Sequence, residues 1–262
     1  MMLARPGTLL LRWLLLMLVG GLLLQGYFAL RIAMMRVSLP ASTTVQRTEL
    51  ARIALDPQLP FHWSQERLGH AELPDNLRRA VIASEDAGFV SHGGVEWAAL
   101  RQAWQRNQAA EARTERLNER RQASAERRHK PAPDPVEPKV VGGSTITQQL
   151  AKNLFLSGER NFLRKGQELV IALMLEALLD KSRILDIYLN SVEWGNGVFG
   201  AGAAAPHYFG RPAASLSLAQ AATLAVLLPS PKRYGQNIAS GFIRGRASLI
   251  ARRSGAVAIP RD

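Results

Sequence analysis

The sequence has 262 residues, of which 47% are hydrophobic, and this is enough for one good-sized core in one or two domains. The absence of cysteine excludes disulfides, thiolate metal sites and a cysteine nucleophile. A formal net charge of +12 indicates an anionic partner, which could be nucleic acid, lipid or substrate.

An uncharged apolar stretch near the N-terminus predicts a transmembrane anchor. Residues 13–30, between Arg12 and Arg31, carry no charge, and Arg31 can snorkel, so the span extends over 13–35. A tail at 1–12 precedes this anchor, and a connector at 36–60 follows it. The alternative is a cleaved signal peptide, but the apolar core is long and no Ala-x-Ala site follows. Arginines lie at both ends, so the positive-inside rule does not decide the orientation.

Helical patterns dominate the domain predicted at 61–262. Apolar spacing predicts helices over 77–85, with Asp75 or Asn76 as the cap, over 97–105, and over most of the chain after Gly143. One of these, an Ala/Leu helix up to residue 227, opens at Ser215 or Ser217. Alternating strand patterns are scarce, so the predicted fold class is mainly α.

Residues 106–139 differ in kind, because they are crowded with Arg, Glu, Gln and Ala and end in a proline-rich run. Few large apolar residues occur there, so the stretch cannot bury a core. We predict a charged, disordered insertion with partial helix up to about Arg128. Interleaved glutamates dilute the positive field, which makes a nucleic-acid arm the weaker alternative.

The first candidate for chemistry is the segment 84–94, in which Glu85 and Asp86 close an apolar helix beside Phe89 and His92. A carboxylate at the end of a buried helix is partly desolvated, which raises its pKa toward values useful for a general base. The alternative is an acidic surface turn with His92 as a cap, and such turns are common.

The second candidate is the segment 142–154, where two glycines precede a helix with a polar face. Thr145, Gln148 and Lys152 share that face by helical spacing, and a hydroxyl, an amide and a cation together suit an oxygen-rich, anionic ligand. A capping box accounts for Thr145 and Gln148, with Ser144 as a good N-cap. Capping does not explain three further polar residues, Gln149, Lys152 and Asn153.

The third candidate is a charged row at helical spacing that contains Arg160, Arg164, Lys165 and Glu168. Such a row is either a set of helix-surface ion pairs, each worth a few tenths of a kcal/mol, or a cationic clamp for a diphosphate. Spacing alone leaves both readings open.

Other motifs carry no chemistry. Gly195, Gly197 and Gly200 match a dinucleotide-binding pattern, but the preceding segment is helical, so we interpret them as a glycine-rich turn between helices. The five histidines show no metal-ligand spacing, and no Ser/His/Asp arrangement stands out.

Together these segments resemble the glycosyltransferase domain of bacterial peptidoglycan synthases, the lysozyme-like glycosyltransferase family 51. Five blocks occur in the family's order, at 84–94, 142–156, 164–168, 181–190 and 195–202, and the resemblance covers roughly residues 60–250. The chain ends at Asp262 without room for a penicillin-binding transpeptidase domain, so it resembles the monofunctional biosynthetic peptidoglycan transglycosylases. Two features depart from the family: Asp186 stands where a Glu is usual, and the 106–139 insertion is long.

The resemblance implies a lysozyme-like fold, anchored in the bacterial inner membrane by its N-terminal helix. The tail is then cytoplasmic and the catalytic domain periplasmic. The implied reaction polymerises lipid II into β-1,4-linked glycan, with inversion at the donor MurNAc anomeric carbon and release of polyprenyl diphosphate. The alternatives are a membrane-anchored lytic transglycosylase or muramidase, and a basic binding module for anionic polymers without enzymatic activity.

The resemblance also implies roles for individual residues. Glu85 is the general base and Glu168 the second essential carboxylate. The residues expected to bind substrate are Asp86, Phe89, His92, Gly143, Ser144, Thr145, Gln148, Lys152, Asn153, Arg160, Arg164 and Lys165. No cofactor is expected beyond a divalent cation, Mg or Mn, at the diphosphate, and its protein ligands are unknown. Expected partners are lipid II, the growing glycan chain and the membrane, with transpeptidases or division proteins as candidates and no nucleic acid.

Overall fold

The computed structural model describes residues 6–58, 61–129, 131–138, 142–156 and 162–261. The chain forms two compact units, one made of Met1–Gly94 with Ile146–Asp262 and the other of Val95–Thr145. The sequence analysis predicts one domain at 61–262 with an insertion at 106–139. The second unit is longer than this insertion, since it begins at Val95 and ends at Thr145.

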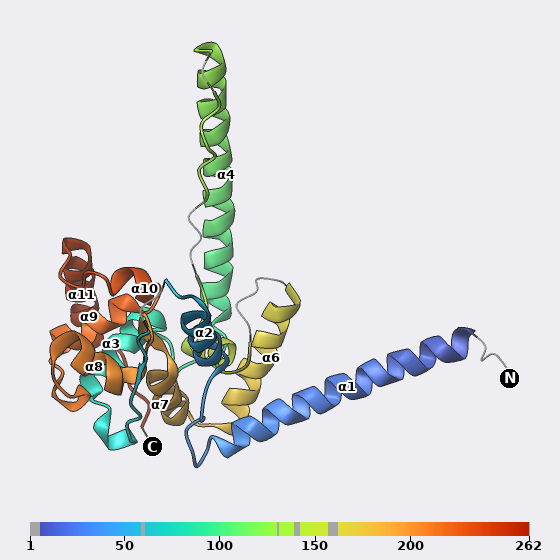
Figure 1. Ribbon diagram of the computed structural model, residues 1–262, viewed down its shortest axis with the longest axis vertical. Coiled ribbons are helices and arrows are strands. Elements are labelled where there is room, and N and C mark those ends of the chain that lie inside the picture. The colour runs from blue at the N-terminus through green and yellow to red at the C-terminus, as the bar shows by residue number, and fades with distance from the viewer. Residues whose placement is uncertain (1–5, 59–60, 130, 139–141, 157–161, 262) are drawn as a thin grey trace. The chain divides into compact units, whose positions relative to one another are not determined.

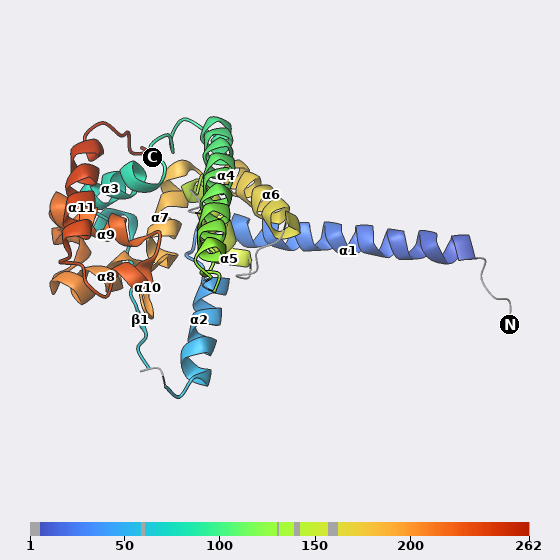
Figure 2. The ribbon, with the colours of Figure 1, turned by 90° about the horizontal axis from the view of Figure 1, so that it is seen from above.

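The first helix of the larger unit is α1, Pro6–Met34, whose Leu9–Met34 stretch is long and apolar enough to cross a membrane. It leads away from the other helices of its unit, and only its C-terminal end lies beside α6, Phe162–Leu178 (Figures 1 and 2). There Gln25 and Gln167 exchange two amide hydrogen bonds of 3.0 Å. One apolar N-terminal helix is consistent with the predicted single-pass anchor.

A helix that the sequence analysis did not predict lies inside the expected connector at 36–60. This helix, α2, covers Thr44–Leu55 and begins with a capping box. The Thr43 hydroxyl accepts the Gln46 N–H at 3.1 Å, while the Gln46 amide accepts the Thr43 N–H at 2.8 Å. Its Ile53 side chain is buried.

The core forms where α3, Asp75–Glu85, packs with α9, Leu218–Leu227, and α11, Gly241–Ser254 (Figures 1 and 2). The helix predicted at 77–85 is confirmed, but it begins earlier because Pro74 takes the cap position. Ser217 caps α9, one of the two residues predicted to do so, and its hydroxyl accepts the Gln220 N–H at 3.3 Å.

Two further helices carry site segments. These are α5, Ile146–Phe155, and α7, Lys181–Ser191. Most of α7 is buried on all its faces, which makes it the central helix of the unit. The remaining helical elements of this unit are α8, Gly200–Phe209, α10, Pro231–Tyr234, and the short 3₁₀ turns η1, His70–Glu72, and η2, Ala213–Ser215. The prediction of a mainly α fold is confirmed.

A small sheet contains the glycine-rich segment. Strand β3, Val198–Phe199, lies between β1, Ser64–Gln65, which is parallel to it, and β2, Glu193–Gly195, which is antiparallel. Gly197 has a φ of 70°, and a Cβ there would lie 2.0 Å from the His62 carbonyl oxygen. The segment is therefore a tight hairpin between α7 and α8. This agrees with the predicted glycine-rich turn between helices and not with a nucleotide site.

The second unit contains α4, Trp97–Arg127, which continues well past the predicted helix at 97–105. Residues 131–138 have no regular secondary structure and run back beside α4 (Figure 1). The Asn118 side chain holds them, since its amide donates to the Val136 carbonyl at 3.0 Å and accepts the Val136 N–H at 2.9 Å. The predicted partial helix is thus present and ends at Arg127, while the proline-rich part is extended.

Candidate active site

Glu85 is the last residue of α3, and its carboxylate is half-buried. The Ser84 hydroxyl donates to one carboxylate oxygen at 3.3 Å, and the Gln149 amide donates to the other at 2.9 Å. Burial raises the pKa of Glu85, and the charge of Asp86 adds to this, whereas the two hydrogen bonds and Lys152 act in the opposite direction. A carboxylate with raised proton affinity suits a general base.

A buried tyrosine fixes the amide that contacts Glu85. The Tyr188 hydroxyl, on α7, donates to the Gln149 carbonyl oxygen at 2.9 Å, so the NH₂ group of that amide is turned toward the Glu85 carboxylate. Burial, together with the charges of Glu85 and Asp86, raises the pKa of Tyr188 well above its usual value. The phenol therefore stays protonated and keeps donating.

Asp86 supports the turn after Glu85 from inside the protein. One of its carboxylate oxygens lies 2.8 Å from His92 Nε2, and the other accepts the N–H of Ile146 at 3.1 Å. Because Ile146 is the first residue of α5, the Asp86 carboxylate satisfies a free N–H at a helix start. Asp86 thus holds the start of α5 against the end of α3, and His92 supports the Asp86 carboxylate. Contact of Asp86 and His92 with substrate stays a prediction.

Phe89 lies in the core, because its side chain is fully buried. The Lys181 ammonium lies 4.5 Å from the centroid of its ring. The predicted contact of Phe89 with substrate does not fit this placement, since no face of the ring is exposed. Its position instead anchors the turn that follows Glu85.

The segment 142–154 places its polar residues differently from the prediction. Gln148 and Asn153 are buried, whereas Lys152 is exposed. The two α5 residues that act on Glu85 are Gln149, through its hydrogen bond, and Lys152, through its charge. Gln148 and Lys152 do share one side of α5 by their spacing, but Gln148 is buried while Lys152 is exposed. Contact of Gln148, Lys152 and Asn153 with substrate stays a prediction.

The residues that precede α5 belong to the second unit. An added Cβ on Gly143 would lie 2.9 Å from the Ala103 Cβ, so the glycine lets this loop approach α4 closely. Ser144 and Thr145 follow in the same loop. For these three residues, contact with substrate stays a prediction.

On α6, Glu168 gathers two cations around a buried carboxylate. One oxygen accepts from Arg164 Nη1 at 3.2 Å, and the other is bonded by the Lys165 ammonium. Of the two interpretations left open for this row, the ion pairs are present, although around a buried carboxylate and not at the helix surface. Whether the cations also bind a diphosphate stays a prediction, and Arg160 lies outside the described residues. Because both Glu168 oxygens bind cations of the protein, a divalent metal at this carboxylate would compete with them, and the metal stays a prediction.

Sequence comparison identifies the family. A sequence model described as transglycosylase matches residues 58–116 and 135–254. The chain belongs to this transglycosylase family. Similar proteins named biosynthetic peptidoglycan transglycosylase occur in Ralstonia nicotianae, 48% identical over 92% of this chain and 94% of that protein, and in Cupriavidus metallidurans, 47% identical over 93% and 95%. Another, in Paraburkholderia phytofirmans, is 42% identical over 98% of this chain and 97% of that protein.

The family match bears on the fold class, and it leaves one internal segment of the chain unmatched. The transglycosylase domain is a lysozyme-like glycosyltransferase fold, as the resemblance implied. The family match omits residues 117–134, which lie inside the segment predicted as an insertion.

Asp186 of this transglycosylase has a structural role. Its buried carboxylate contacts Arg78 Nη2 at 3.0 Å and His70 Nδ1 at 2.7 Å. These contacts tie α7 to α3 and to η1, so the shorter side chain at this position still connects three elements of the core.

Sequence reasoning missed Gln149 and Tyr188 as residues that act on Glu85. The only signal for Gln149 was that helix capping left it unexplained. Tyr188 gave none, because a tyrosine within an apolar helical period looks like an ordinary core residue.

Proposed function

We propose that this transglycosylase polymerises lipid II into β-1,4-linked glycan strands and releases polyprenyl diphosphate. Family membership supports a peptidoglycan glycosyltransferase of cell wall synthesis. The observation that carries the proposal is Glu85, whose half-buried carboxylate has a raised pKa and a fixed amide donor. These properties suit a base that must take a proton from a sugar hydroxyl near neutral pH.

In the proposed reaction, Glu85 removes the proton from the 4-hydroxyl of the acceptor GlcNAc. That oxygen attacks the anomeric carbon of the donor MurNAc and forms the new glycosidic bond with inversion. The bond from the anomeric carbon to the diphosphate oxygen breaks, and its electron pair leaves with the diphosphate. A diphosphate is already a good leaving group, so no carboxylic acid has to protonate it, unlike the alkoxide of an inverting glycosidase.

The cations of α5 and α6 fit the leaving-group side of this reaction. Lys152 is exposed, and Arg164 and Lys165 keep 18% and 44% of their side chains exposed. Glu168 contributes one negative charge against the two positive charges of its partners, so this cluster keeps a net positive charge of one. We assign Glu168 the task of holding these cations where they neutralise the departing diphosphate.

The remaining predicted residues complete the proposed site. Asp86 and His92 position the base through α5, whereas Gly143, Ser144, Thr145, Gln148, Asn153 and Arg160 are proposed to shape the sugar and phosphate subsites.

The alternative of a lytic transglycosylase or muramidase is not favoured, since the relatives carry a biosynthetic name. The test is to incubate the purified full chain with lipid II and, separately, with sacculi. We expect glycan polymer from lipid II and no soluble muropeptides from sacculi. Muropeptides without polymer would refute the synthetic function.

We also propose that α1 anchors the protein in the inner membrane with its N-terminus in the cytoplasm and the catalytic unit in the periplasm. Because the chain has no cysteine, single cysteines report this directly. A membrane-impermeant maleimide should label Ser42→Cys, but not Ala4→Cys, in cells with a permeabilised outer membrane. The reverse pattern would contradict the orientation. Transpeptidases and division proteins are proposed partners on the periplasmic side.

A further inference from the structure

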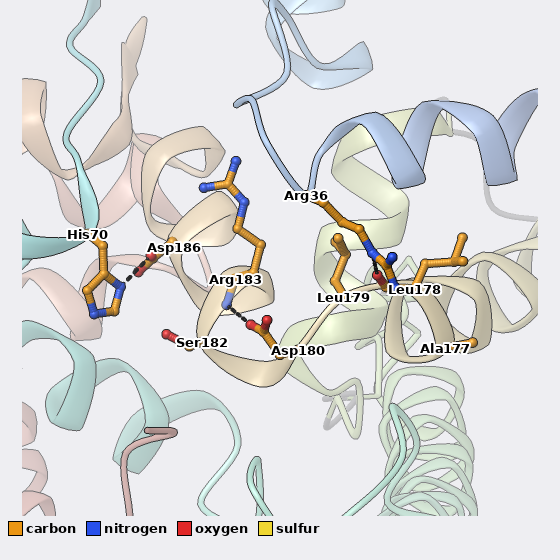
Figure 3. Close-up of a pocket in the computed structure, with 9 residues that line it drawn as sticks. All are labelled: Arg36, His70, Ala177, Leu178, Leu179, Asp180, Ser182, Arg183 and Asp186. Atoms are coloured by element: carbon orange, nitrogen blue, oxygen red, sulfur yellow. Dashed lines mark hydrogen bonds and ion pairs between the residues drawn. The ribbon is translucent and has the colours of Figure 1, made fainter. Parts of the chain in front are cut away.

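A pocket of about 520 Å³ opens in the larger unit where the end of α1 meets the turn between α6 and α7 (Figure 3). Arg36 and Leu178 line it from one side and Arg183 and Asp180 from the other. None of these residues takes part in the proposed reaction, so the pocket is separate from the Glu85 site.

Each arginine of the pocket is fixed through its inner nitrogen. Arg36 Nε donates to the Leu178 carbonyl at 2.6 Å, and Arg183 Nε donates to the Met35 carbonyl at 2.6 Å. Leu178 is the last residue of α6 and Met35 directly follows α1, and backbone acceptors at such helix ends lack helical partners. Neither guanidinium has another hydrogen bond or ion pair to the residues that the structure describes. The paired Nη groups therefore remain available as a fork, the geometry that binds a phosphate with two hydrogen bonds.

The carboxylates of the pocket already have partners. Asp180 caps α7 by accepting the Arg183 N–H at 2.8 Å. Asp186 is held by Arg78 at 3.0 Å and by His70 at 2.7 Å. Asp180 keeps its negative charge, because its partner is a backbone N–H, whereas the charge of Asp186 is paired with Arg78. The two arginines therefore exceed the one uncompensated carboxylate of the pocket, and an anion meets a net positive charge.

The depth of the pocket along α1 identifies the source of such an anion. The apolar span ends at Met34, two residues before Arg36. Each headgroup layer of a bilayer is about 5–7 Å thick beyond the hydrocarbon, which is comparable to the length of these two residues. With α1 in the membrane, Arg36 lies among lipid headgroups, and the leucines of the pocket wall are suited to the start of an acyl chain.

We propose that this pocket binds the phosphate headgroup of an anionic phospholipid, held between Arg36 and Arg183. The lipid joins the end of the anchor to the α6–α7 turn and so fixes the catalytic unit at the membrane surface. The inference rests on α1 as the membrane anchor and is independent of the reaction assigned to Glu85.

The test compares the wild type with Arg36→Gln/Arg183→Gln. Glutamine places an N–H donor close to the position of arginine Nε, so the helix-end bonds can persist while the Nη fork and the charge are lost. Arg252→Gln/Arg253→Gln on α11 is the control, since it removes the same charge outside the pocket. The full chain is reconstituted in phosphatidylcholine nanodiscs with and without phosphatidylglycerol, and native mass spectrometry counts the lipid retained after transfer to detergent.

We expect the wild type and the control to retain phosphatidylglycerol, and the pocket variant to bind it about thirtyfold more weakly, as loss of two arginine–headgroup interactions implies. Equal retention by all three proteins would overturn the proposal, and so would equal loss in the control. Displacement by inorganic phosphate or by polyprenyl diphosphate would also overturn it, because the site would then take free phosphate or substrate lipid. If the double variant does not fold, Arg36→Gln alone, at an exposed residue, must still weaken retention. Lipid II polymerisation in detergent without phosphatidylglycerol should be unchanged, which separates failure of this proposal from failure of the proposed function.

Discussion

At the scale of single residues, the proposed base depends on a chain of two hydrogen bonds. Tyr188 orients the Gln149 amide, and that amide stabilises the ionised form of Glu85. Burial acts against ionisation and raises the pKa of the carboxyl group. Activity should therefore fall as pH decreases through a pKa higher than that of an ordinary glutamate, because only the ionised carboxylate accepts a proton.

Tyr188→Phe tests this chain. Without the hydroxyl, the Gln149 amide can turn its carbonyl oxygen toward Glu85, and loss of the donor raises the pKa of the carboxyl group further. We expect the acid limb of the kcat profile to move to higher pH and kcat near neutral pH to fall roughly tenfold, with KM for lipid II little changed.

Tyr208→Phe is the matched control, since that hydroxyl donates to the Trp194 carbonyl at 2.9 Å and not to the site. In a Gln149→Met background, Tyr188→Phe should add little further loss. An acid limb that shifts equally in both tyrosine variants would contradict the positioning role. So would losses of kcat that are fully additive when Tyr188→Phe is combined with Gln149→Met.

Local spacing predicted the Glu168 cluster, because Arg164 and Lys165 lie four and three residues before Glu168 on the same helix. It could not predict that Gln149 meets Glu85, 64 residues earlier in the chain, or that Tyr188 meets Gln149, 39 residues away. Such contacts depend on how α3, α5 and α7 pack, which a periodic pattern does not specify.

At the scale of elements, the sequence analysis predicts the helices that have an apolar period. It does not predict a helix whose signal in the sequence is of another kind. The helix α2 mixes charged and apolar residues, so its readable signal was the capping box of Thr43 and Gln46. The start of α5 was interpreted as self-capped, whereas the Asp86 carboxylate binds the Ile146 N–H across 60 residues of sequence.

A charged cluster between α2, β2 and α10 gives an element-scale prediction. Burial, together with the charge of Glu49, raises the pKa of Glu193 to about 7, although Lys232 lies 3.6 Å away. A carboxyl group whose pKa is higher in the folded state favours folding when protonated. Its contribution is therefore complete below the usual pKa near 4.5 and is lost as pH rises toward 7.

Glu193→Gln removes this dependence. The variant and the wild type should have similar free energies of unfolding at acidic pH, and at pH 8 the variant should be more stable by on the order of 3 kcal/mol. Chemical denaturation at both pH values measures the difference. A variant that is less stable than the wild type at pH 8 would show that the ion pair with Lys232 outweighs burial.

At the scale of the whole molecule, the mainly α class and the order of the site segments could be predicted from the sequence. The division into two units could not, because the sequence analysis includes the helix predicted at 97–105 in the domain at 61–262. In the structure this helix belongs to the second unit, and Ala103 is the only buried residue of α4. Because α4 buries so little, we expect part of the second unit to be dispensable for folding.

Deletion of residues 117–134 should leave lipid II polymerisation within about twofold of wild type, with an unchanged melting temperature, since surface segments without core contacts contribute little to stability. The family match omits these residues, and the bonds between Asn118 and Val136 place the cut ends close together for a short Gly-Ser link. A large loss of polymerisation with an intact fold would instead give the segment a direct role in the reaction.

The most direct test of the central claim is polymerisation of lipid II by Glu85→Gln. Glutamine keeps the size of the side chain and can still bond the Gln149 amide, but it cannot accept the acceptor's proton. We predict that the variant binds lipid II as the wild type does and that polymerisation falls by a factor of about a hundred or more, in the range lost with a general base. Polymerisation at the wild-type rate, with binding intact, would show that Glu85 is not the base.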